Sequence, residues 1–126
     1  MGSDVERRVR QICLALPGAT ERLSHGAPAF FAKAQFLQLW VNGHHDHQFP
    51  HLWCAAPPGV MAELVAGDGG KFFKPPYVGS RGWVGLRLDG RLDWGEIETL
   101  CEDAYRTVAP KTLLRRLGTE PWRGSR

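Results

Sequence analysis

The residues of this sequence best suited to binding lie in one stretch, KFFKPPYVGSRGWVGLRLDG (Lys71–Gly90). Its aromatic and cationic side chains are interleaved, and no acid stands between Asp68 and Asp89. Aromatic rings stack on nucleic-acid bases and cations neutralise phosphates, so the stretch predicts a nucleic-acid-binding surface. The candidate binding residues are Lys71, Lys74, Tyr77, Arg81, Trp83 and Arg87.

The second half of this stretch is predicted to be a half-buried strand, Trp83–Leu88. Alternation gives it an apolar face of Val84, Leu86 and Leu88, and an opposite face of Trp83, Gly85 and Arg87. The first half contains Pro75-Pro76, which removes two backbone donors and fixes φ, so it cannot be a regular element. We therefore expect a rigid basic loop leading into a strand that displays Trp83 and Arg87, while Phe72 and Phe73 fill the edge of the core.

Two other kinds of binding remain open for this surface. A small-molecule-binding or enzymatic pocket would be built from His25, Tyr77, Arg81 and Trp83. A protein-interaction domain would use an exposed face of the sheet. The formal net charge of +3 mildly disfavours nucleic acid. The sequence has no GxSxG elbow, phosphate loop, dinucleotide fingerprint or HExxH motif, which disfavours an enzyme more strongly. We expect no catalytic residue and no cofactor.

A histidine-rich segment, NGHHDHQFP (Asn42–Pro50), is predicted to be a loop by its Asn-Gly step and its polarity. Its potential metal ligands, together with the histidine that follows it, are His44, His45, Asp46, His47 and His51. Consecutive loop residues point in different directions, and no HxH or HxxxH pair stands on a predicted strand or helix. We therefore expect a solvated loop and no native metal site.

The sequence contains three cysteines, Cys13, Cys54 and Cys101, which are widely spaced and have apolar neighbours. This usage is typical of reduced core thiols in a cytosolic protein. Cys54 shares the apolar side of its strand with Leu52, and nothing in the sequence lowers its pKa, so it is predicted to be a core residue rather than a nucleophile. With no apolar run of membrane length, we expect a cytoplasmic protein without a membrane partner.

Periodicity and capping signals predict the elements that position these residues. The expected helices are Ser3–Leu16, Val60–Ala66, a long helix capped by Asp93, and a short last helix that starts near Pro110. The expected strands are Ala29–Lys33, Phe36–Val41, His51–Ala56 and Trp83–Leu88. A second basic run is interpreted as a solvated helical face; it consists of Arg106, Lys111, Arg115 and Arg116.

This order of elements, with its short connections, predicts an α+β fold. We expect a two-layer sandwich in which helices cover a mainly antiparallel sheet, with the other sheet face at least partly open. The length of 126 residues, with 43% hydrophobic and 23% charged residues, is that of one soluble domain. That domain is expected to span residues 1–118, followed by a tail, Thr119–Arg126.

Six blocks of the chain, in this order, resemble the MmcQ/YjbR family. They are LPGATE, HGAPAFF, LWCAAPPGV, FFKPPYVGSRGWVGLRLD, DW followed by EI, and DAYRTVAPK, which together run from Leu16 to Lys111. The resemblance implies a small α+β domain similar to frataxin-like and double-wing DNA-binding domains. Members of the family are commonly described as DNA-binding proteins by analogy of fold, which is a weak warrant for function. The loop Asn42–Pro50 departs from the short His-His-Gly-Asp type of turn that relatives often carry.

Overall fold

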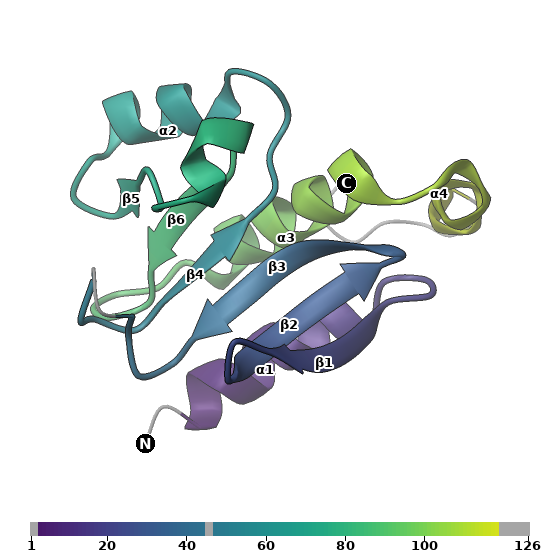
Figure 1. Cartoon of the computed structure of the whole chain (residues 1–126), viewed down its shortest axis with the longest axis horizontal. Coiled ribbons are helices and arrows are strands. Elements are labelled where there is room, and N and C mark those ends of the chain that lie inside the picture. Colours follow the sequence, from purple (N-terminus) through teal and green to yellow (C-terminus); the bar gives the residue numbers. More distant parts are fainter. Residues whose placement is uncertain (1–2, 45–46, 119–126) are drawn as a thin grey trace.

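The centre of the molecule is an antiparallel sheet, seen in a computed structural model that describes residues 3–44 and 47–118 (Figure 1). Within these residues the sheet has six strands in the order β1-β2-β3-β4-β6-β5. Their bounds are Thr20–Ser24 for β1, Ala27–Ala32 for β2, Ala34–Trp40 for β3, His51–Cys54 for β4, Phe72–Phe73 for β5 and Val84–Arg87 for β6. The predicted α+β architecture with a mainly antiparallel sheet is confirmed.

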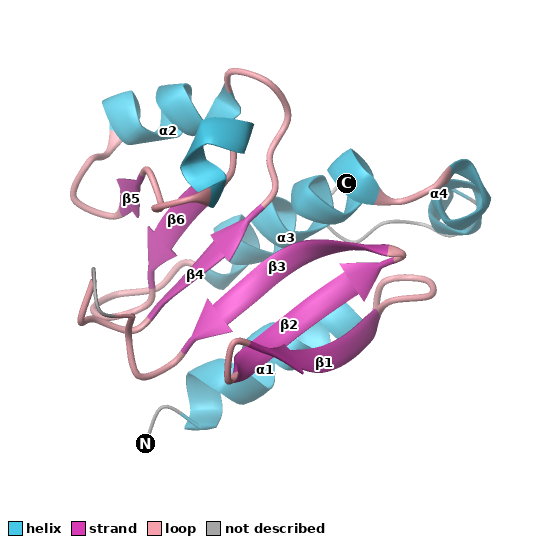
Figure 2. Ribbon diagram, viewed as in Figure 1, coloured by secondary structure: helices cyan, strands magenta, loops and turns pink. Residues whose placement is uncertain are grey.

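Two helices cover one face of the sheet, α1 (Ser3–Leu14) and α3 (Trp94–Val108) (Figures 1 and 2). Helix α3 packs on β2, β3 and β4, and α1 packs beside α3. The side chain of Asp93 caps α3 as predicted, because it accepts a hydrogen bond from the backbone N–H of Glu96 at 3.2 Å. The buried stripe of α3 meets the sheet where Tyr105 packs edge-on against Phe36, with ring centroids 5.7 Å apart.

Two further helices and a single 3-10 turn complete the described chain. Helix α2 (Val60–Gly67) lies near β5 and follows Pro57-Pro58-Gly59, and the turn η1 (Val78–Arg81) precedes β6. Both gather at the β5–β6 end of the sheet in Figure 1. Helix α4 (Lys111–Gly118) ends the described residues, so the expected tail at 119–126 lies outside them. The larger apolar side chains of α2, those of Val60, Met61, Leu64 and Val65, are only half-buried.

A β-bulge in β3 decides which of its side chains face the helices. Phe30 of β2 pairs with Leu37 and Phe31 pairs with Gln35, which leaves Phe36 as an extra residue in β3. Such an insertion shifts the alternation of side chains by one position. Phe36 and Leu37 are therefore both in the core, and Leu39 follows them inward. The residues on either side, Gln35 and Gln38, face the opposite side of the sheet, although they are three positions apart.

Two strands were not predicted from the sequence. The segment Thr20–Ser24 lies outside the elements expected from the sequence, but it forms β1 at the edge of the sheet. Its pairing with β2 uses only backbone hydrogen-bonding groups, which any sequence supplies. Three of its five side chains are exposed, so the sequence lacks the alternation of apolar and polar residues that would indicate a strand. The short strand β5, Phe72–Phe73, lies in the stretch expected to be irregular and ends before Pro75. The hairpin between β2 and β3 turns at Lys33, whose φ is 69°, so Ala34 and Gln35, which lay between the two expected strands, belong to β3.

Candidate ligand-binding pocket on the open sheet face

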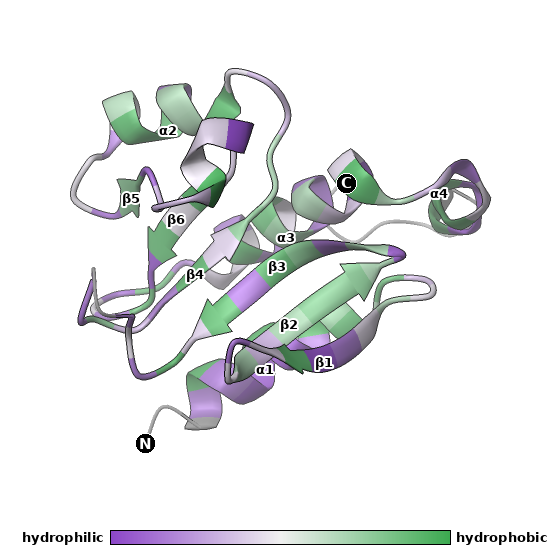
Figure 3. Ribbon diagram, in the orientation of Figure 1, coloured by the Kyte–Doolittle hydropathy of each residue, from purple (hydrophilic) through white to green (hydrophobic). Residues whose placement is uncertain are grey.

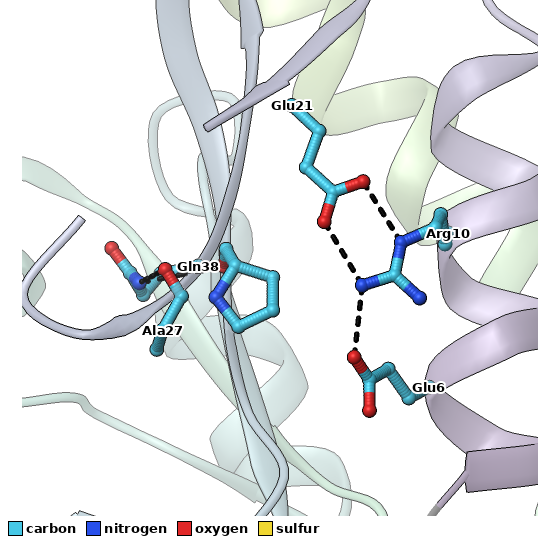
Figure 4. Close-up of polar contacts among 6 residues, drawn as sticks. Glu6, Arg10, Glu21, Ala27 and Gln38 are labelled. Carbon is cyan, nitrogen blue, oxygen red and sulfur yellow. Dashed lines mark hydrogen bonds and ion pairs between the residues drawn. The ribbon is translucent and has the colours of Figure 1, made fainter. Parts of the chain in front are cut away.

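A pocket of about 740 Å³ lies on the sheet face opposite α1 and α3. Figure 4 shows the orientation, with Gln38 on one side of the strands and Arg10 of α1 on the other. The aromatic part of the pocket lining consists of Trp40, His44, Trp53, Tyr77 and Trp83. The remaining polar side chains of the lining are His25, Gln35, Gln38 and Arg81. None of the described residues that line the pocket is acidic.

Residues from distant parts of the sequence meet in this pocket. His25 comes from the β1–β2 turn, Tyr77 and Arg81 come from the loop and turn before β6, and Trp83 stands directly before β6. These are the residues we expected to form a small-molecule pocket, and the fold brings them together. Of the residues expected to bind nucleic acid, Tyr77, Arg81 and Trp83 line the pocket, whereas Lys71, Lys74 and Arg87 do not.

Two cations of the basic stretch are paired with acids. The Nζ atom of Lys71 lies 2.7 Å from Oε1 of Glu96 on α3, and this hydrogen bond raises the pKa of Lys71. Arg87 donates two hydrogen bonds to Asp89, at 3.0 and 2.7 Å, which raises the pKa of Arg87. Its guanidinium carbon also lies 4.0 Å from the centroid of the Phe49 ring.

The other two cations keep their charge available. Within residues 3–44 and 47–118, neither Lys74 nor Arg81 forms an ion pair with a carboxylate, and both side chains are exposed. Arg81 lies over Trp83, with the guanidinium carbon 5.4 Å from the ring centroid, so a cation stands against one aromatic wall of the pocket. The basic stretch therefore offers two unpaired cations instead of the four suggested by its sequence.

The predicted display of Trp83 is wrong. The alternation itself holds, because Val84 and Leu86 are in the core on the helix side, yet Trp83 is only 5% exposed. The loop that precedes β6 folds back over this face of the sheet. A Cβ at Gly85 would overlap the ring of Phe73, so Phe73 packs directly on the strand. Trp83 is therefore a buried wall of the pocket and not a surface residue.

Tyr77 is the exposed aromatic residue of the stretch, with 71% of its surface accessible. Its φ and ψ angles are 65° and −65°, and the N–H of Val78 donates to the carbonyl of Pro76 at 2.6 Å. These features define a γ-turn with positive φ at its centre, a rare and strained conformation. Pro75 and Pro76 stiffen the approach to this turn, and Ser80 Oγ donates to the carbonyl of Tyr77 at 3.0 Å. The Tyr77 ring is thus held outward beside the pocket.

The described histidines of the histidine-rich loop, His44 and His47, are packed against aromatic rings rather than solvated, contrary to our expectation. The ring of His44 lies 4.7 Å from that of Trp40 and 5.2 Å from that of Trp53. The ring of His47 lies 4.4 Å from that of Phe73, and both histidines are half-buried. Aromatic residues on the open face attract the loop, and such contacts between distant residues are not visible in a local sequence pattern. His45 and Asp46 lie outside the described residues.

His51 of β4 is fully buried beneath this loop. Its Nδ1 donates to the carbonyl of Phe49 at 2.7 Å, and burial lowers its pKa, so the neutral ring is favoured. Among the described residues, no three histidine, cysteine or acidic side chains are arranged to hold a metal ion. Cys13 and Cys54 are buried, and burial raises the pKa of both thiols, so neither has the character of a nucleophile.

Two glutamines of β3 belong to the pocket and were missed in the sequence. Gln38 is 4% exposed and donates to the carbonyls of Ser24 and Ala27, at 3.0 and 3.2 Å (Figure 4). Gln35 donates to Oε1 of Gln38 at 2.9 Å. Figure 3 shows hydrophilic colouring both near the start and in the middle of β3, with hydrophobic colouring between them. Two glutamines within the otherwise apolar segment AQFLQLW could have indicated a polar site on this strand. The bulge that brings both to one face of the sheet could not be predicted from the sequence.

The fold and the pocket define an α+β domain whose sheet has helices on one side and an aromatic cavity on the other. A sequence model of the YjbR family matches residues 14–107, and the chain belongs to this family. The fold is similar to the crystal structure of a Deinococcus radiodurans protein with a DUF419 domain. The TM-score is 0.72 at 18% identity, and the match covers 94% of this chain and 92% of that one. No curated protein matches the chain. No helix of the described residues has the length and apolarity needed to cross a membrane.

Proposed function

We propose that this protein binds single-stranded DNA through the open face of its sheet and catalyses no reaction. The observation that carries the proposal is the position of Tyr77, which is 71% exposed beside the aromatic pocket. Lys74 and Arg81, which flank it in the sequence, have no carboxylate partner among the described residues. Proteins that bind single strands without strong sequence preference combine aromatic stacking surfaces with cations along the backbone.

A single strand suits this surface better than a duplex. A base can enter an aromatic pocket only when it is unstacked and unpaired, and a single strand offers such bases at little energetic cost. A duplex, by contrast, is gripped mainly through its phosphates, and many cations are needed for that. Two of the four cations in the basic stretch are already paired with Glu96 and Asp89. Affinity should therefore come from stacking more than from charge.

Fluorescence anisotropy with a labelled single strand and with the matching duplex tests the proposal. We expect weak binding, with a dissociation constant of about 10⁻⁴–10⁻⁶ M at physiological salt. With two phosphates neutralised, log affinity for the single strand should fall with log salt at a slope of about −1.4. Tyr77→Ala should weaken binding by about 1–3 kcal/mol because it removes a stacking ring.

Charge variants provide the controls for this experiment. Lys74→Ala with Arg81→Ala should flatten the salt slope by nearly its whole value, because both phosphate contacts are lost. Lys111→Ala removes an exposed cation of α4 far along the chain from the pocket lining and should leave the slope unchanged. Absence of binding at low salt, or a slope that ignores Lys74 and Arg81, would rule out DNA as the partner.

The second candidate function is binding of a free small molecule in the same pocket. Its volume of about 740 Å³ lies within the range of ligand pockets, and aromatic walls with few polar groups are typical of them. Native mass spectrometry under gentle conditions, before and after denaturation, would detect a small molecule that is retained during purification. A retained ligand that is lost in Tyr77→Ala but kept in Lys111→Ala would favour this second function.

A further inference from the structure

We propose that Gln35 is the residue through which the pocket recognises its ligand, and that the ligand is a planar heteroaromatic ring with an exocyclic amino group. An adenine or cytosine base is the simplest ring of this class, whether it belongs to a strand or to a free mononucleotide. Where the ring is part of a DNA strand, the inference deepens the proposed function and rests on it. Where the ring belongs to a free mononucleotide, the inference does not depend on that function. It is carried by the hydrogen bonds around Gln38 and Gln35.

The orientation of the Gln38 amide follows from its partners. One end of this amide faces the backbone carbonyls of Ser24, Ala27 and Pro28, at 3.0, 3.2 and 3.4 Å. All three are acceptors, so the end that faces them must be the NH₂ group. The oxygen Oε1 of Gln38 therefore points the other way, toward Gln35. Because Gln38 is 4% exposed, water cannot readily replace these partners.

The orientation of Gln35 follows in turn. Oε1 of Gln38 requires a donor, and the nearest is the NH₂ group of Gln35 at 2.9 Å. The same nitrogen lies 3.3 Å from the carbonyl oxygen of Leu37, so both of its hydrogens have acceptors. The atom that remains is Oε1 of Gln35, which accepts no hydrogen bond from any described residue. Gln35, which lines the pocket, thus has an acceptor oxygen that none of these partners uses, and the two hydrogen bonds of its NH₂ group hold the amide in place before any ligand binds.

The bulge in β3 makes this arrangement possible. Without the extra residue Phe36, the side chains of Gln35 and Gln38 would lie on opposite faces of the sheet. With it, both line the pocket, and the Gln35 amide is braced against a residue that is held by the β1–β2 hairpin. A side chain on a strand, braced by a second side chain, holds a ligand group more accurately than a loop residue does.

The other groups of the pocket restrict the ligand class further. Its aromatic walls favour a flat ring, and the Arg81 guanidinium at its edge favours a ligand with an anionic group such as a phosphate. An acceptor at Gln35 favours a ring that carries an amino donor, as adenine, cytosine and guanine do. Thymine and uracil have no amino group, and their imino N–H is flanked by two carbonyl oxygens that the glutamine oxygen would repel, so a hydrogen bond from this N–H to Gln35 is weaker.

The test compares free mononucleotides with single DNA strands that carry matching bases. Binding of the 5′-monophosphates of adenosine, cytidine and uridine is measured by isothermal titration calorimetry. Single strands that differ at one position, A, C or T, are measured by anisotropy. We expect the amino-bearing base to bind about five- to tenfold more tightly than uracil or thymine. Gln35→Leu should abolish this preference, while Gln11→Leu, the same change on exposed α1, should preserve it.

Each outcome separates the inference from the proposed function. Mononucleotides bound with a Gln35-dependent amino preference, but no strand bound, would support the inference and overturn DNA binding. Strands bound without base preference, or with a preference that survives Gln35→Leu, would overturn the inference and leave DNA binding intact. Failure to bind any of these mononucleotides and strands would overturn both. If Gln35→Leu does not fold, equal affinities of the unaltered protein for all bases still overturn the inference.

Discussion

At the scale of a single residue, Tyr77 has a strained backbone that little burial of its side chain offsets. Its backbone adopts φ 65° and ψ −65°, and a residue in such a sparsely populated conformation costs about 1–3 kcal/mol. Its ring is 71% exposed and therefore recovers little of this cost by burial. Strain of this kind persists where the surrounding structure enforces it, and it is concentrated at binding sites. An exposed ring on a strained turn is consistent with a role in contacting a ligand.

We predict that Tyr77→Gly stabilises the protein by about 1 kcal/mol, because glycine adopts positive φ without a Cβ clash. The same substitution should weaken strand binding, since the stacking ring is lost. Urea unfolding followed by tryptophan fluorescence measures the first effect. Tyr77→Ala is the control, because it removes the ring but retains the strain, and its stability should change little. A loss of stability in Tyr77→Gly would show that the turn is unstrained or that the ring is packed.

For Trp83 we predict the opposite effect, a loss of stability on substitution. At 5% exposure its removal would leave a large cavity, and Trp83→Ala should lower the free energy of unfolding by about 3–5 kcal/mol. Leu86→Ala, at a neighbouring core position, is the matched reference, with an expected loss of about 2–5 kcal/mol. Urea midpoints of the two variants should therefore be similar. A much smaller decrease in the free energy of unfolding for Trp83→Ala would indicate that Trp83 is a surface residue, as the alternation of the strand alone had suggested.

The histidine-rich loop behaves as a packed element rather than a connection. Its rings extend an aromatic cluster over β4, where His51 is buried and its pKa is lowered by desolvation. His44 and His47 lie close enough to lower this pKa further when they are charged. A group whose folded-state pKa is lowered binds protons more readily in the unfolded state. Stability is therefore retained above the unfolded pKa of 6.5 and lost as the pH falls below it.

This linkage predicts that the free energy of unfolding falls between pH 7.5 and pH 5, and that His51→Gln reduces the fall. The glutamine cannot be protonated in this range, and its amide can still donate to the Phe49 carbonyl. Urea titrations of both proteins across this interval provide the measurement. Gln11→Leu, a change at an exposed residue that does not titrate, should leave the pH dependence intact. Equal slopes for wild type and His51→Gln would contradict the assignment.

At the scale of the whole molecule, Tyr105 joins segments that are distant in sequence. Its ring packs on Phe36 of β3, and its hydroxyl donates to the carbonyl of Pro17 at 2.6 Å. The carbonyl of Leu113 lies 3.5 Å from the same hydroxyl. Helix α3 is thereby connected to the sheet, to the end of α1 and to α4. Burial raises the pKa of Tyr105, so the hydroxyl stays protonated and able to donate.

We expect Tyr105→Phe to destabilise the fold by about 1–3 kcal/mol, because the Pro17 carbonyl is left without its partner while the ring packing is kept. Thermal and urea unfolding would show the loss as a single cooperative transition shifted to lower midpoint. Tyr77→Phe provides the matched control, since its hydroxyl makes no hydrogen bond to the described residues and its removal should be neutral. If Tyr105→Phe leaves stability unchanged, a water molecule must donate to the Pro17 carbonyl in place of the Tyr105 hydroxyl.

Local signals in the sequence were sufficient for most elements. The Asp93 cap, the apolar stripes of α1 and α3, and the alternation of β6 depend on residues a few positions apart, so their physical cause is contained in the local sequence. The Pro75-Pro76 step likewise predicted a rigid loop before β6. Six sequence blocks were specific enough to indicate the family, which the match over residues 14–107 confirms.

The tertiary structure alone decided how these elements form the pocket. Glu96 neutralises Lys71 from a helix 25 positions along the chain, so the charge of the basic stretch could not be counted from the stretch itself. The burial of Trp83, the packing of the histidine loop and the pairing of β1 each depend on residues that approach only in the folded state. The bulge at Phe36 brings Gln35 and Gln38 to one face because β2 and β3 pair out of step there, and pairing between strands is a property of both strands together.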